Sequence, residues 1–379
     1  MDVCSIDVPF KLFRLIMKYL FYLGHPAHFH LFKNIINNLR ANNHKIFIII
    51  KKKDVLEDLL VDKGWKFYNI YPNDRGNSKL SLGLSIIKRD IETFRIVLKE
   101  RPDLMIGTSS EISHIGKLTG IKSLVVNEDD AEAVPLFANL SYPFATNIIV
   151  PSSCSVGKWT GKTIFYNGYH ELAYLHPNQY SKVEDNSSTQ TTNRKFFLLR
   201  FAKLTAHHDD GKKGISNKFA LKIIEKLSAF GDVYISSERS LTVELEKYRL
   251  NINPSLMMDN LSKADLYIGD SQTMAAEAAV LGVPSIRFND FVGKLSYLEE
   301  LEHKYGLTYG IKTSEPEKLL QKIDELLAMP NLKEEWQRRR QKMLADKIDV
   351  TAFMVWFIEN YPESVRVMKE TPEYQYRFK

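Results

Sequence analysis

The fold is decided by residues 264–284, which read ADLYIGDSQTMAAEAAVLGVP. The run at 266–269 is apolar and ends in glycine, short polar residues follow it, and an alanine-rich run leads to Leu-Gly-Val-Pro. This order predicts a buried strand, a tight turn and a helix. Because the first amides of a helix lack partners, such a turn suits a phosphate group. The segment therefore predicts an α/β fold with an anion-binding turn.

The candidate nucleotide-binding residues of this segment belong to the turn and the start of the helix: Gly269, Asp270, Ser271, Thr273 and Glu277. The glycine and the short polar side chains would surround a diphosphate. We expect the carboxylate of Glu277, about one turn further along, to hold the two hydroxyl groups of a ribose. An ordinary capped helix with a solvated Glu277 is the alternative interpretation.

The same alternation of strand, loop and helix extends outward over both halves of the chain. Strands are predicted at 19–23, 45–50, 66–70, 104–107, 123–126 and 147–150, and again at 196–199, 233–236, 266–269 and 284–286. Stretches with helical spacing of apolar residues separate them. Continuous apolar strands that alternate with helices indicate parallel sheets covered on both faces. The fold class is therefore α/β, with two Rossmann-like lobes whose sheets face each other across a cleft.

The length of 379 residues exceeds what one hydrophobic core usually supports. A polar segment at 181–193 carries hardly an apolar residue and is typical of a linker between domains. We expect an N-terminal lobe at 1–165, a linker at 166–194 and a C-terminal lobe at 195–345. Residues 346–379 form a helical tail that we expect to pack back on the N-terminal lobe.

The composition, 44% hydrophobic and 26% charged, is that of a globular protein. A net charge of +6 suits an anionic partner and leaves open a peripheral contact with the inner membrane surface. No nucleic-acid partner is expected, because most basic residues are interleaved with acids. Cys4 and Cys154 cannot build a disulfide framework or a four-cysteine zinc site. With no apolar run of about 20 residues and no cleavage site for a signal peptide, we expect a cytoplasmic protein.

A loop rich in histidine follows the first predicted strand, at the edge where open α/β sheets bind ligands. It reads Gly24-His25-Pro26-Ala27-His28. His25 is a candidate catalytic acid or base, because imidazole exchanges protons near neutral pH. Gly24 and His28 are candidates for contact with an acceptor. Since no carboxylate or cysteine follows at ligand spacing, we expect no metal here.

Acidic residues follow two further strands of the N-terminal half. Glu111 comes after the strand at 104–107, and Asp129 after the strand at 123–126. Acids that lie close together raise one another's pKa, which leaves one of them able to act as a base. Glu111 and Asp129 are therefore candidate catalytic residues. For the neighbouring Glu128 and Asp130, a solvated loop is at least an equal alternative.

Basic and polar residues follow the strands of the C-terminal half. Arg200 could form paired hydrogen bonds to a diphosphate and offset its charge, which would make a metal ion unnecessary. The further candidates for binding the nucleotide-sugar are Lys203, His207 and Ser237. An exposed turn is an equal alternative for the region around His207.

Residues 264–284 resemble the C-terminal nucleotide-sugar motif of GT-B glycosyltransferases and of UDP-N-acetylglucosamine 2-epimerases. From Met17 onward the chain resembles an uncharacterised prokaryotic family of GT-B-like proteins, often associated with surface-polysaccharide genes. Its opening corresponds to Gly-His-Pro-Ala-His at 24–28 and its middle to Gly-Tyr-His-Glu-Leu-Ala-Tyr-Leu at 168–175. The acids of the N-terminal half resemble those that flank the sugar in the 2-epimerases.

The resemblance implies a GT-B fold and an enzyme that needs neither metal nor cofactor. The expected activity is transfer of a sugar from a nucleotide-sugar donor, UDP-linked by preference, to a glycan or lipid-linked acceptor. Epimerisation of a UDP-N-acetylhexosamine is one alternative. A protein that binds a glycan or a nucleotide-sugar without catalysis is the other.

Overall fold

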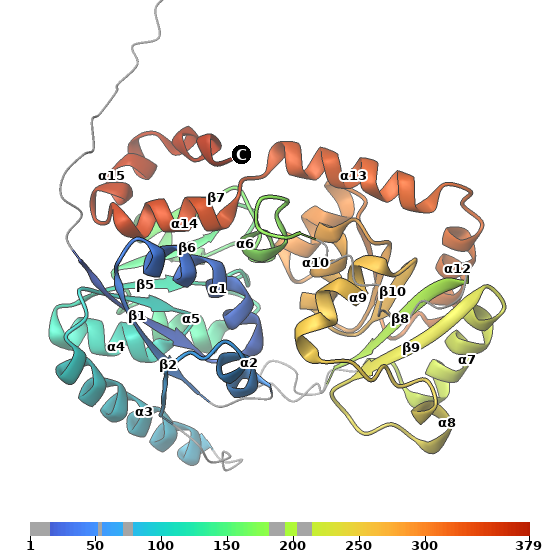
Figure 1. Ribbon diagram of the computed structural model, residues 1–379, viewed down its shortest axis with the longest axis horizontal. Coiled ribbons are helices and arrows are strands. Elements are labelled where there is room, and N and C mark those ends of the chain that lie inside the picture. Colours follow the sequence, from blue (N-terminus) through green and yellow to red (C-terminus); the bar gives the residue numbers. More distant parts are fainter. Residues whose placement is uncertain (1–15, 52–54, 71–78, 182–193, 203–213) are drawn as a thin grey trace, which may run out of the picture.

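The computed structural model describes residues 16–51, 55–70, 79–181, 194–202 and 214–379, with side chains of the third helix described from residue 83. It contains two parallel sheets, each with its own covering helices, in two lobes that lie side by side (Figure 1). The predicted α/β class is confirmed.

The N-terminal sheet has seven parallel strands in the order β3-β2-β1-β4-β5-β6-β7. They are β1 (Lys18–Leu23), β2 (Lys45–Ile50), β3 (Tyr68–Asn69), β4 (Leu104–Gly107), β5 (Lys122–Val126), β6 (Asn147–Pro151) and β7 (Thr163–Tyr166). Alternate residues of each strand enter two different cores: Phe21 and Ile106 pack on one side, Tyr22 and Met105 on the other. Both faces are therefore covered, as the continuous apolar runs predict.

Helices from the described residues of the N-terminal half pack around this sheet. They are α1 (Pro26–Ala41), α2 (Leu56–Asp62), α3 (Lys79–Glu100), α4 (Ser110–Thr119), α5 (Pro135–Ser141) and the short 3-10 helix η1 (Gly157–Lys162). Helices α3, α4 and α5 pack in sequence against one another. Helix α1 packs against α14 (Val350–Glu359), which comes from the end of the chain.

The C-terminal sheet has five parallel strands in the order β12-β11-β10-β8-β9. They are β8 (Lys195–Phe201), β9 (Gly231–Ser237), β10 (Leu266–Gly269), β11 (Ser285–Phe288) and β12 (Thr308–Ile311). The helices of this lobe are α7 (Asn217–Ser228), α8 (Val243–Glu246), η3 (Pro254–Leu256), α9 (Met257–Lys263), α10 (Gln272–Leu281), α11 (Ser296–Glu299), η4 (Glu300–Lys304) and α12 (Pro316–Leu327).

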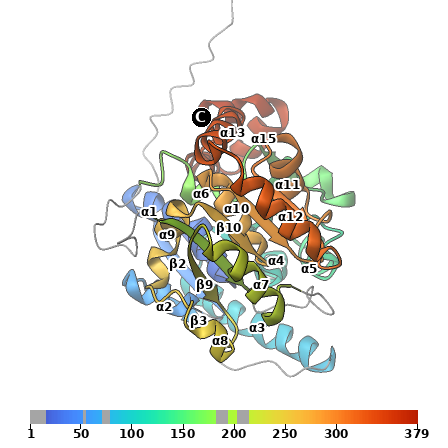
Figure 2. The same ribbon diagram turned by 90° about the vertical axis from the view of Figure 1, so that its right-hand side faces the viewer.

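The last helices carry the chain back to the N-terminal lobe, as predicted. Helix α13 (Leu332–Asp346) runs from the C-terminal lobe across the top of Figure 1, and α14 and α15 (Glu363–Glu370) lie on the N-terminal lobe, followed by η5 (Pro372–Phe378). The Glu359 carboxylate accepts a hydrogen bond from Asn42 Nδ2 at 2.6 Å, and Tyr361 donates one to Asn147 at 3.0 Å. In the orthogonal view, α13 and α15 lie at one end of the molecule and α3 and α8 at the other (Figure 2).

The first part of the predicted linker is packed rather than exposed. Residues 168–175 are almost entirely buried and include the short helix α6 (Leu172–Leu175). The segment's polar neighbours at 182–193 lie outside the described residues. The limits of the two lobes remain predictions.

The two lobes are joined by polar contacts, and a pocket lies between them. The pocket has a volume of about 270 Å³ and is lined by α2 of one lobe and by Asn253 and Pro254 of the other. Among the described helices, none combines the length and apolar character that crossing a membrane requires.

Candidate functional site

Each sheet has one position where the strand order reverses. In the N-terminal sheet β1 and β4 are neighbours, and in the C-terminal sheet β8 and β10 are neighbours. The chain leaves these pairs in opposite directions, so the loops after them diverge and leave room for a ligand. The predicted site residues of both lobes follow these strands.

At the N-terminal reversal, the histidine loop is held by local hydrogen bonds. His25 caps α1 by accepting a hydrogen bond from the Ala27 amide at 3.2 Å. His28 Nδ1 accepts one from the Gly24 amide at 3.1 Å and lies 2.6 Å from the Thr108 hydroxyl, which follows β4. The structure therefore brings Gly24, His25 and His28 to the predicted edge, and their roles remain predictions.

Glu111 is paired inside the N-terminal lobe. Its carboxylate accepts a hydrogen bond from Arg89 Nε, and both side chains are buried. The Ser110 hydroxyl donates a further hydrogen bond at 3.3 Å. The carboxylate thereby compensates the charge of a buried guanidinium. Glu111 is thus paired at the start of α4, and its catalytic role remains a prediction.

At the C-terminal reversal, Arg200 of β8 lies in register with Gly269 of β10. Its Nη1 donates to the Ser236 hydroxyl at 2.6 Å and its Nη2 to the Glu238 carboxylate, whereas Nε is buried without a partner among the described residues. A side chain at Gly269 would collide with the Tyr267 hydroxyl and the Arg200 stem. Glycine is therefore required for the close approach of these two strands.

The start of α10 is open in the way predicted for a phosphate site. Ser271 caps the helix by accepting a hydrogen bond from the Met274 amide at 3.4 Å. The side chains of Ser271, Gln272 and Thr273 are half-buried, so the first turn is not covered by packed residues. The positive end of the helix dipole thus remains accessible to an anion.

Asp270 accepts hydrogen bonds from the protein backbone. It is buried, and its two carboxylate oxygens accept hydrogen bonds from the amides of Ala202 at 2.6 Å and Ile215 at 3.1 Å. Burial raises its pKa to about 6, against the opposing effect of these hydrogen bonds. These hydrogen bonds fix the loops that contain Ala202 and Ile215, and the direct nucleotide contact of Asp270 remains a prediction.

The three remaining residues predicted to bind the nucleotide-sugar are Ser237, Lys203 and His207. The Ser237 hydroxyl donates to the Arg239 carbonyl at 2.7 Å and accepts from the Arg239 amide at 3.2 Å, so it closes a turn after β9. Lys203 and His207 lie outside the described residues.

A group of mostly buried polar side chains joins the two lobes, and we call it the interlobe cluster. It consists of Glu128, Asp129, His170, Glu171, Tyr174 and Glu277. Tyr174 of α6 donates a hydrogen bond to the Glu277 carboxylate of α10 at 2.7 Å. Helix α6 packs against α10. This contact places the acidic residues Glu128, Asp129 and Glu171, which we call the acidic wall, next to the helix whose first turn is the candidate phosphate site.

Glu171 is buried in this cluster without hydrogen bonds from the described residues to its carboxyl group. It is 1% exposed, and neither carboxylate oxygen has a hydrogen-bond partner among the described residues. Burial raises the pKa of Glu171 well above its ordinary value, and the charges of Glu128, Glu277 and Asp129 add to the effect. His170 Nε2 also lacks a partner there, while its Nδ1 lies 3.4 Å from Glu128.

Two other carboxyl groups of the cluster titrate near neutrality. Burial raises the pKa of Asp129 to about 7, with Glu128 raising it further and His170 lowering it. Burial raises the pKa of Glu277 to about 7 as well, although the Tyr174 hydrogen bond and Arg200 oppose the rise. Groups with such pKa values exchange protons readily at physiological pH.

Helix α1 adds two nitrogen-bearing side chains to this seam. The His30 ring lies 5.4 Å from the Tyr174 ring, and Lys33 Nζ lies 5.5 Å from the same ring centre. Burial, followed by the charge of Lys33, lowers the pKa of His30 to about 3, so this imidazole is neutral. Its Nδ1 is buried and has no partner in the described part of the chain.

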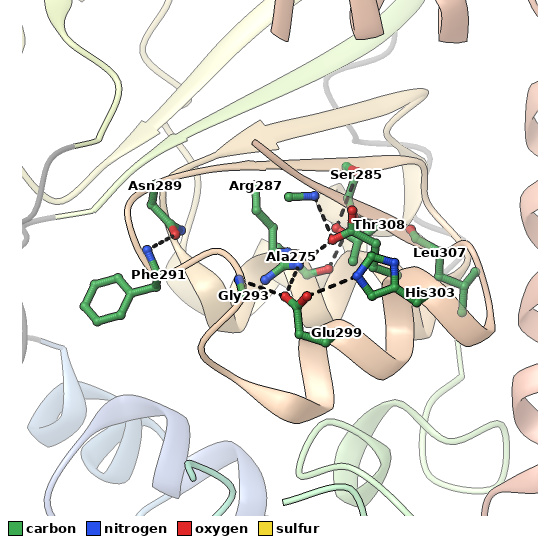
Figure 3. Close-up of polar contacts among 12 residues, drawn as sticks. Ala275, Ser285, Arg287, Asn289, Phe291, Gly293, Glu299, His303, Leu307 and Thr308 are labelled. Atoms are coloured by element: carbon green, nitrogen blue, oxygen red, sulfur yellow. Dashed lines mark hydrogen bonds and ion pairs between the residues drawn. The ribbon is translucent and has the colours of Figure 1, made fainter. Parts of the chain in front are cut away.

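One other cluster deserves comparison because its ligand atoms are close enough for a metal ion. This cluster consists of Glu299, Glu302 and His303, and it is the one such cluster within the described ranges. Figure 3 shows that Glu299 points at Arg287 and also contacts His303. Arg287 is fully buried, and its Nη2 lies 3.2 Å from Glu299 and 2.7 Å from Glu302. These carboxylates already compensate a buried cation, so we assign no metal to them.

Sequence patterns missed Glu171, Tyr174 and Lys33 as members of the site. The sequence does contain one signal, since Glu171 directly precedes an apolar run that ends at Leu175. An acid at the start of a segment that is otherwise buried has to be paired, protonated or functional. Lys33 carries no such signal, because a lysine on a helix is usually solvated.

Two parallel α/β lobes, each with its reversal point, and a C-terminal helix that returns to the first lobe define a GT-B-like protein. The chain belongs to the family described as "Protein of unknown function (DUF354)", whose model matches residues 19–310. This confirms the resemblance to an uncharacterised family with a GT-B-like fold. A search of curated protein sequences finds no match.

Solved structures of two kinds share the fold. A putative UDP-N-acetylglucosamine 2-epimerase from Listeria monocytogenes aligns with a TM-score of 0.69 at 12% identity, over 94% of this chain and 97% of that one. A UDP-GlcNAc 2-epimerase from Neisseria meningitidis, bound to UDP-GlcNAc, gives 0.62 at 14% identity, over 92% and 100%. The spinosyn rhamnosyltransferase SpnG, complexed with thymidine diphosphate, gives 0.62 at 14% identity, over 91% and 100%. At these identities the similarity establishes the fold alone.

Proposed function

We propose that the protein is a glycosyltransferase that moves a sugar from a UDP-linked donor to a glycan or lipid-linked acceptor in surface-polysaccharide synthesis. The observation that carries the proposal is a set of buried polar atoms without partners in the described residues. They belong to His170 and Glu171 of one lobe and to Arg200 and Gln272 of the other. Since buried polar groups are normally paired, such a set indicates a polar ligand between the lobes.

A nucleotide-sugar has chemical groups that match the polar side chains of both lobes. Its diphosphate is anionic and suits both the open start of α10, which carries Ser271 and Thr273, and the Arg200 guanidinium of the adjacent strand β8. Its sugar is rich in hydroxyl groups and suits the carboxyl groups of the opposite wall. Lys203, His207 and Ser237 remain proposed contacts of the donor.

The proposed contact between Glu277 and the ribose depends on the position of Tyr174, which already binds this carboxylate. The Tyr174 hydroxyl now occupies one oxygen of this carboxylate, 2.7 Å away. Glu277 can therefore accept a ribose hydroxyl on its second oxygen, or on both once Tyr174 moves with its lobe. Donor binding would in this way be coupled to the contact between α6 and α10.

In the transfer step we assign Asp129 as the base. The acceptor hydroxyl forms a bond to the anomeric carbon while the bond from that carbon to the diphosphate oxygen breaks. The acceptor proton passes to the Asp129 carboxylate, whose pKa of about 7 suits this exchange. Negative charge develops on the departing diphosphate and is offset by Arg200 and the α10 amides, without a metal ion. His25 is the alternative base, with Gly24 and His28 on the acceptor side.

One observation favours a second function, epimerisation of a UDP-N-acetylhexosamine. Epimerisation needs one group to remove a proton and another to return it, and the acidic wall offers Glu128, Asp129 and Glu171. A protein that binds a nucleotide-sugar or glycan without catalysis remains the third possibility.

Incubation of the pure protein with labelled UDP-sugars, with and without a glycan or lipid-linked acceptor, tests the proposal. Release of UDP only with acceptor, unaffected by EDTA, is the expected result. An altered sugar still attached to UDP would replace transfer by epimerisation. Tight binding with neither product would leave the third possibility, and loss of activity in EDTA would overturn the metal-free step.

Substitution of Arg200 tests the donor site directly. We expect Arg200→Gln to weaken UDP binding roughly tenfold or more in calorimetry, because a charge-assisted contact to phosphate contributes about 1.5–3 kcal/mol. Binding of uridine, which has no phosphate, should change less than twofold. Arg338→Gln, an exposed substitution on α13, serves as the matched control. Equal losses for UDP and uridine would contradict a phosphate contact.

A further inference from the structure

Helix α3 carries an apolar stripe on its solvent face. Leu84, Ile87, Ile91 and Leu98 are each between 46% and 56% exposed. Their spacing of three, four and seven residues places them along one side of the helix. Single exposed apolar residues are common on protein surfaces, but four on one helix face mark an interaction surface.

The stripe is not needed to hold α3 on the protein. The opposite side of the helix is buried through Thr93, Ile96 and Val97 and through the ion pair between Arg89 and Glu111. The apolar side chains of the stripe keep about half of their surface in water, although α3 is already anchored through its other side. They would be expected to face a partner that removes them from water.

Basic residues run beside the stripe. Lys88, Arg95 and Lys99 are exposed and follow one another at spacings of seven and four, so they form one flank. Arg95 pairs with Glu92, and Lys99 lies 3.7 Å from Glu100, but exposed pairs of this kind are weak. The surface thus combines an apolar strip with a mainly basic border.

We propose that α3 docks on an anionic lipid bilayer, with the stripe in the interface and the basic flank among the head groups. Lysine and arginine stems can lie along apolar surface while their charges reach phosphate groups. A second copy of the chain is a poorer occupant, because antiparallel pairing of two stripes would bring two basic flanks together.

The place of α3 in the fold gives docking a consequence. Helix α3 lies at the end of the molecule away from the C-terminal helices, which leaves its outer face clear of them (Figure 2). Because a helix between parallel strands runs against them, α3 begins at the carboxyl edge of the N-terminal sheet, where Gly24 and Thr108 lie. Docking would therefore bring the edge proposed for the acceptor to the membrane surface. The docking itself does not depend on the proposed activity.

Flotation of the full-length protein with vesicles tests the docking. Vesicles of phosphatidylcholine containing phosphatidylglycerol should carry the protein upward, and raised salt or pure phosphatidylcholine should release most of it. We expect the double variant Ile87→Glu with Ile91→Glu to lower the bound fraction roughly tenfold or more. Reversal of charge in Lys88→Glu with Arg95→Glu should lower binding to anionic vesicles only.

The matched control is Val243→Glu, a substitution at an 88% exposed position of α8 in the other lobe, which should leave flotation unchanged. Thermal melts of all variants should agree, because the substituted side chains are exposed. Absence of flotation by the natural chain, or equal flotation by the Ile87 and Ile91 variant, would overturn the proposal. So would a dimer in sedimentation that Ile91→Glu dissociates, since a second copy would then occupy the stripe. UDP binding measured on the same samples separates this result from the donor site.

Discussion

At Glu171 the chain buries a carboxyl group whose two oxygens have no partner among the described residues. A buried polar group without a hydrogen bond costs about 1–3 kcal/mol, and a charged one costs more. Glu128, Asp129 and Glu277 lie near enough to raise its pKa. A set of acids that destabilises the folded protein in this way is typical of a site that exchanges protons.

The pH dependence of stability provides a test at Glu277. Its pKa rises from the ordinary value of 4.5 to about 7 on folding, so the folded protein holds this proton more tightly than the unfolded chain. The folded protein therefore loses stability as the pH rises from about 4.5 through 7, by up to about 3 kcal/mol. Glu277→Gln keeps an acceptor for Tyr174 and should remove this loss.

Urea unfolding at pH 5 and pH 8 measures the difference. The variant should be more stable than the natural chain at pH 8, by up to about 3 kcal/mol, and nearly equal at pH 5. Glu334→Gln, at an exposed position of α13, should show the natural pH dependence. If the free energy of unfolding changed with pH equally in Glu277→Gln and in the natural chain, the Glu277 carboxyl would not be protonated on folding.

Helix α10 combines a buried body with an open first turn. Residues from Met274 to Leu281 are buried, and five of the eight are alanine or valine, which lets α10 approach β10, β11 and α6 closely. Gly282 ends the helix in the left-handed conformation that glycine adopts without strain. The partly exposed turn at Ser271 is therefore presented on a rigid support, as a binding site requires.

Two substitutions at Ser271 separate the capping of α10 from the binding of a phosphate. Ser271→Ala should lower the free energy of unfolding by about 1 kcal/mol, because the Met274 amide loses its acceptor, and should weaken UDP binding. Ser271→Asp restores the cap but adds a negative charge. It should match the natural chain in urea unfolding and bind UDP worse than Ser271→Ala in calorimetry. Tighter or equal UDP binding by the Asp variant would place the diphosphate elsewhere.

At the scale of the whole molecule, the lobes are joined by hydrogen bonds along their seam. Asp130 of the N-terminal lobe accepts from the Ser155 amide at 2.6 Å and from the Ser296 amide of the C-terminal lobe at 2.7 Å. Tyr169 donates to Glu300 at 2.7 Å, and Tyr180 donates to Asp259 at 2.6 Å. These contacts hold the two lobes together, so any parting of the lobes has to break them.

Asp130→Asn should loosen this closure. An amide offers one acceptor where the carboxylate offers two, so the hydrogen bond to either Ser155 or Ser296 is lost. We expect the free energy of unfolding to fall by about 1–3 kcal/mol and the Ser296 amide to exchange its hydrogen faster. Exchange in the central strands should stay unchanged. Unaltered exchange at Ser296 would show that the lobes are held together without this contact.

The elements were more predictable from sequence than the site. Strands β1, β2 and β4 appear where continuous apolar runs predict them, because strands of a parallel sheet are buried on both faces. The strand predicted at 66–70 shrinks to β3, Tyr68–Asn69, at the edge of the sheet, where there is a neighbour on one side only. Asp270 and Glu111 illustrate the opposite case, since their partners Ile215 and Arg89 are distant in sequence.

The sequence by itself determined two parallel α/β lobes, the open turn at the start of α10 and the return of the C-terminal helices. These features follow from local periodicity, capping residues and apolar runs, which act over a few neighbouring residues. Only the tertiary structure decided which polar side chains meet: it placed Glu171 and Tyr174 against Glu277 and withdrew Asp270 and Glu111 into pairs. The physical reason is that burial and pairing depend on neighbours brought together by folding, and no local pattern records them.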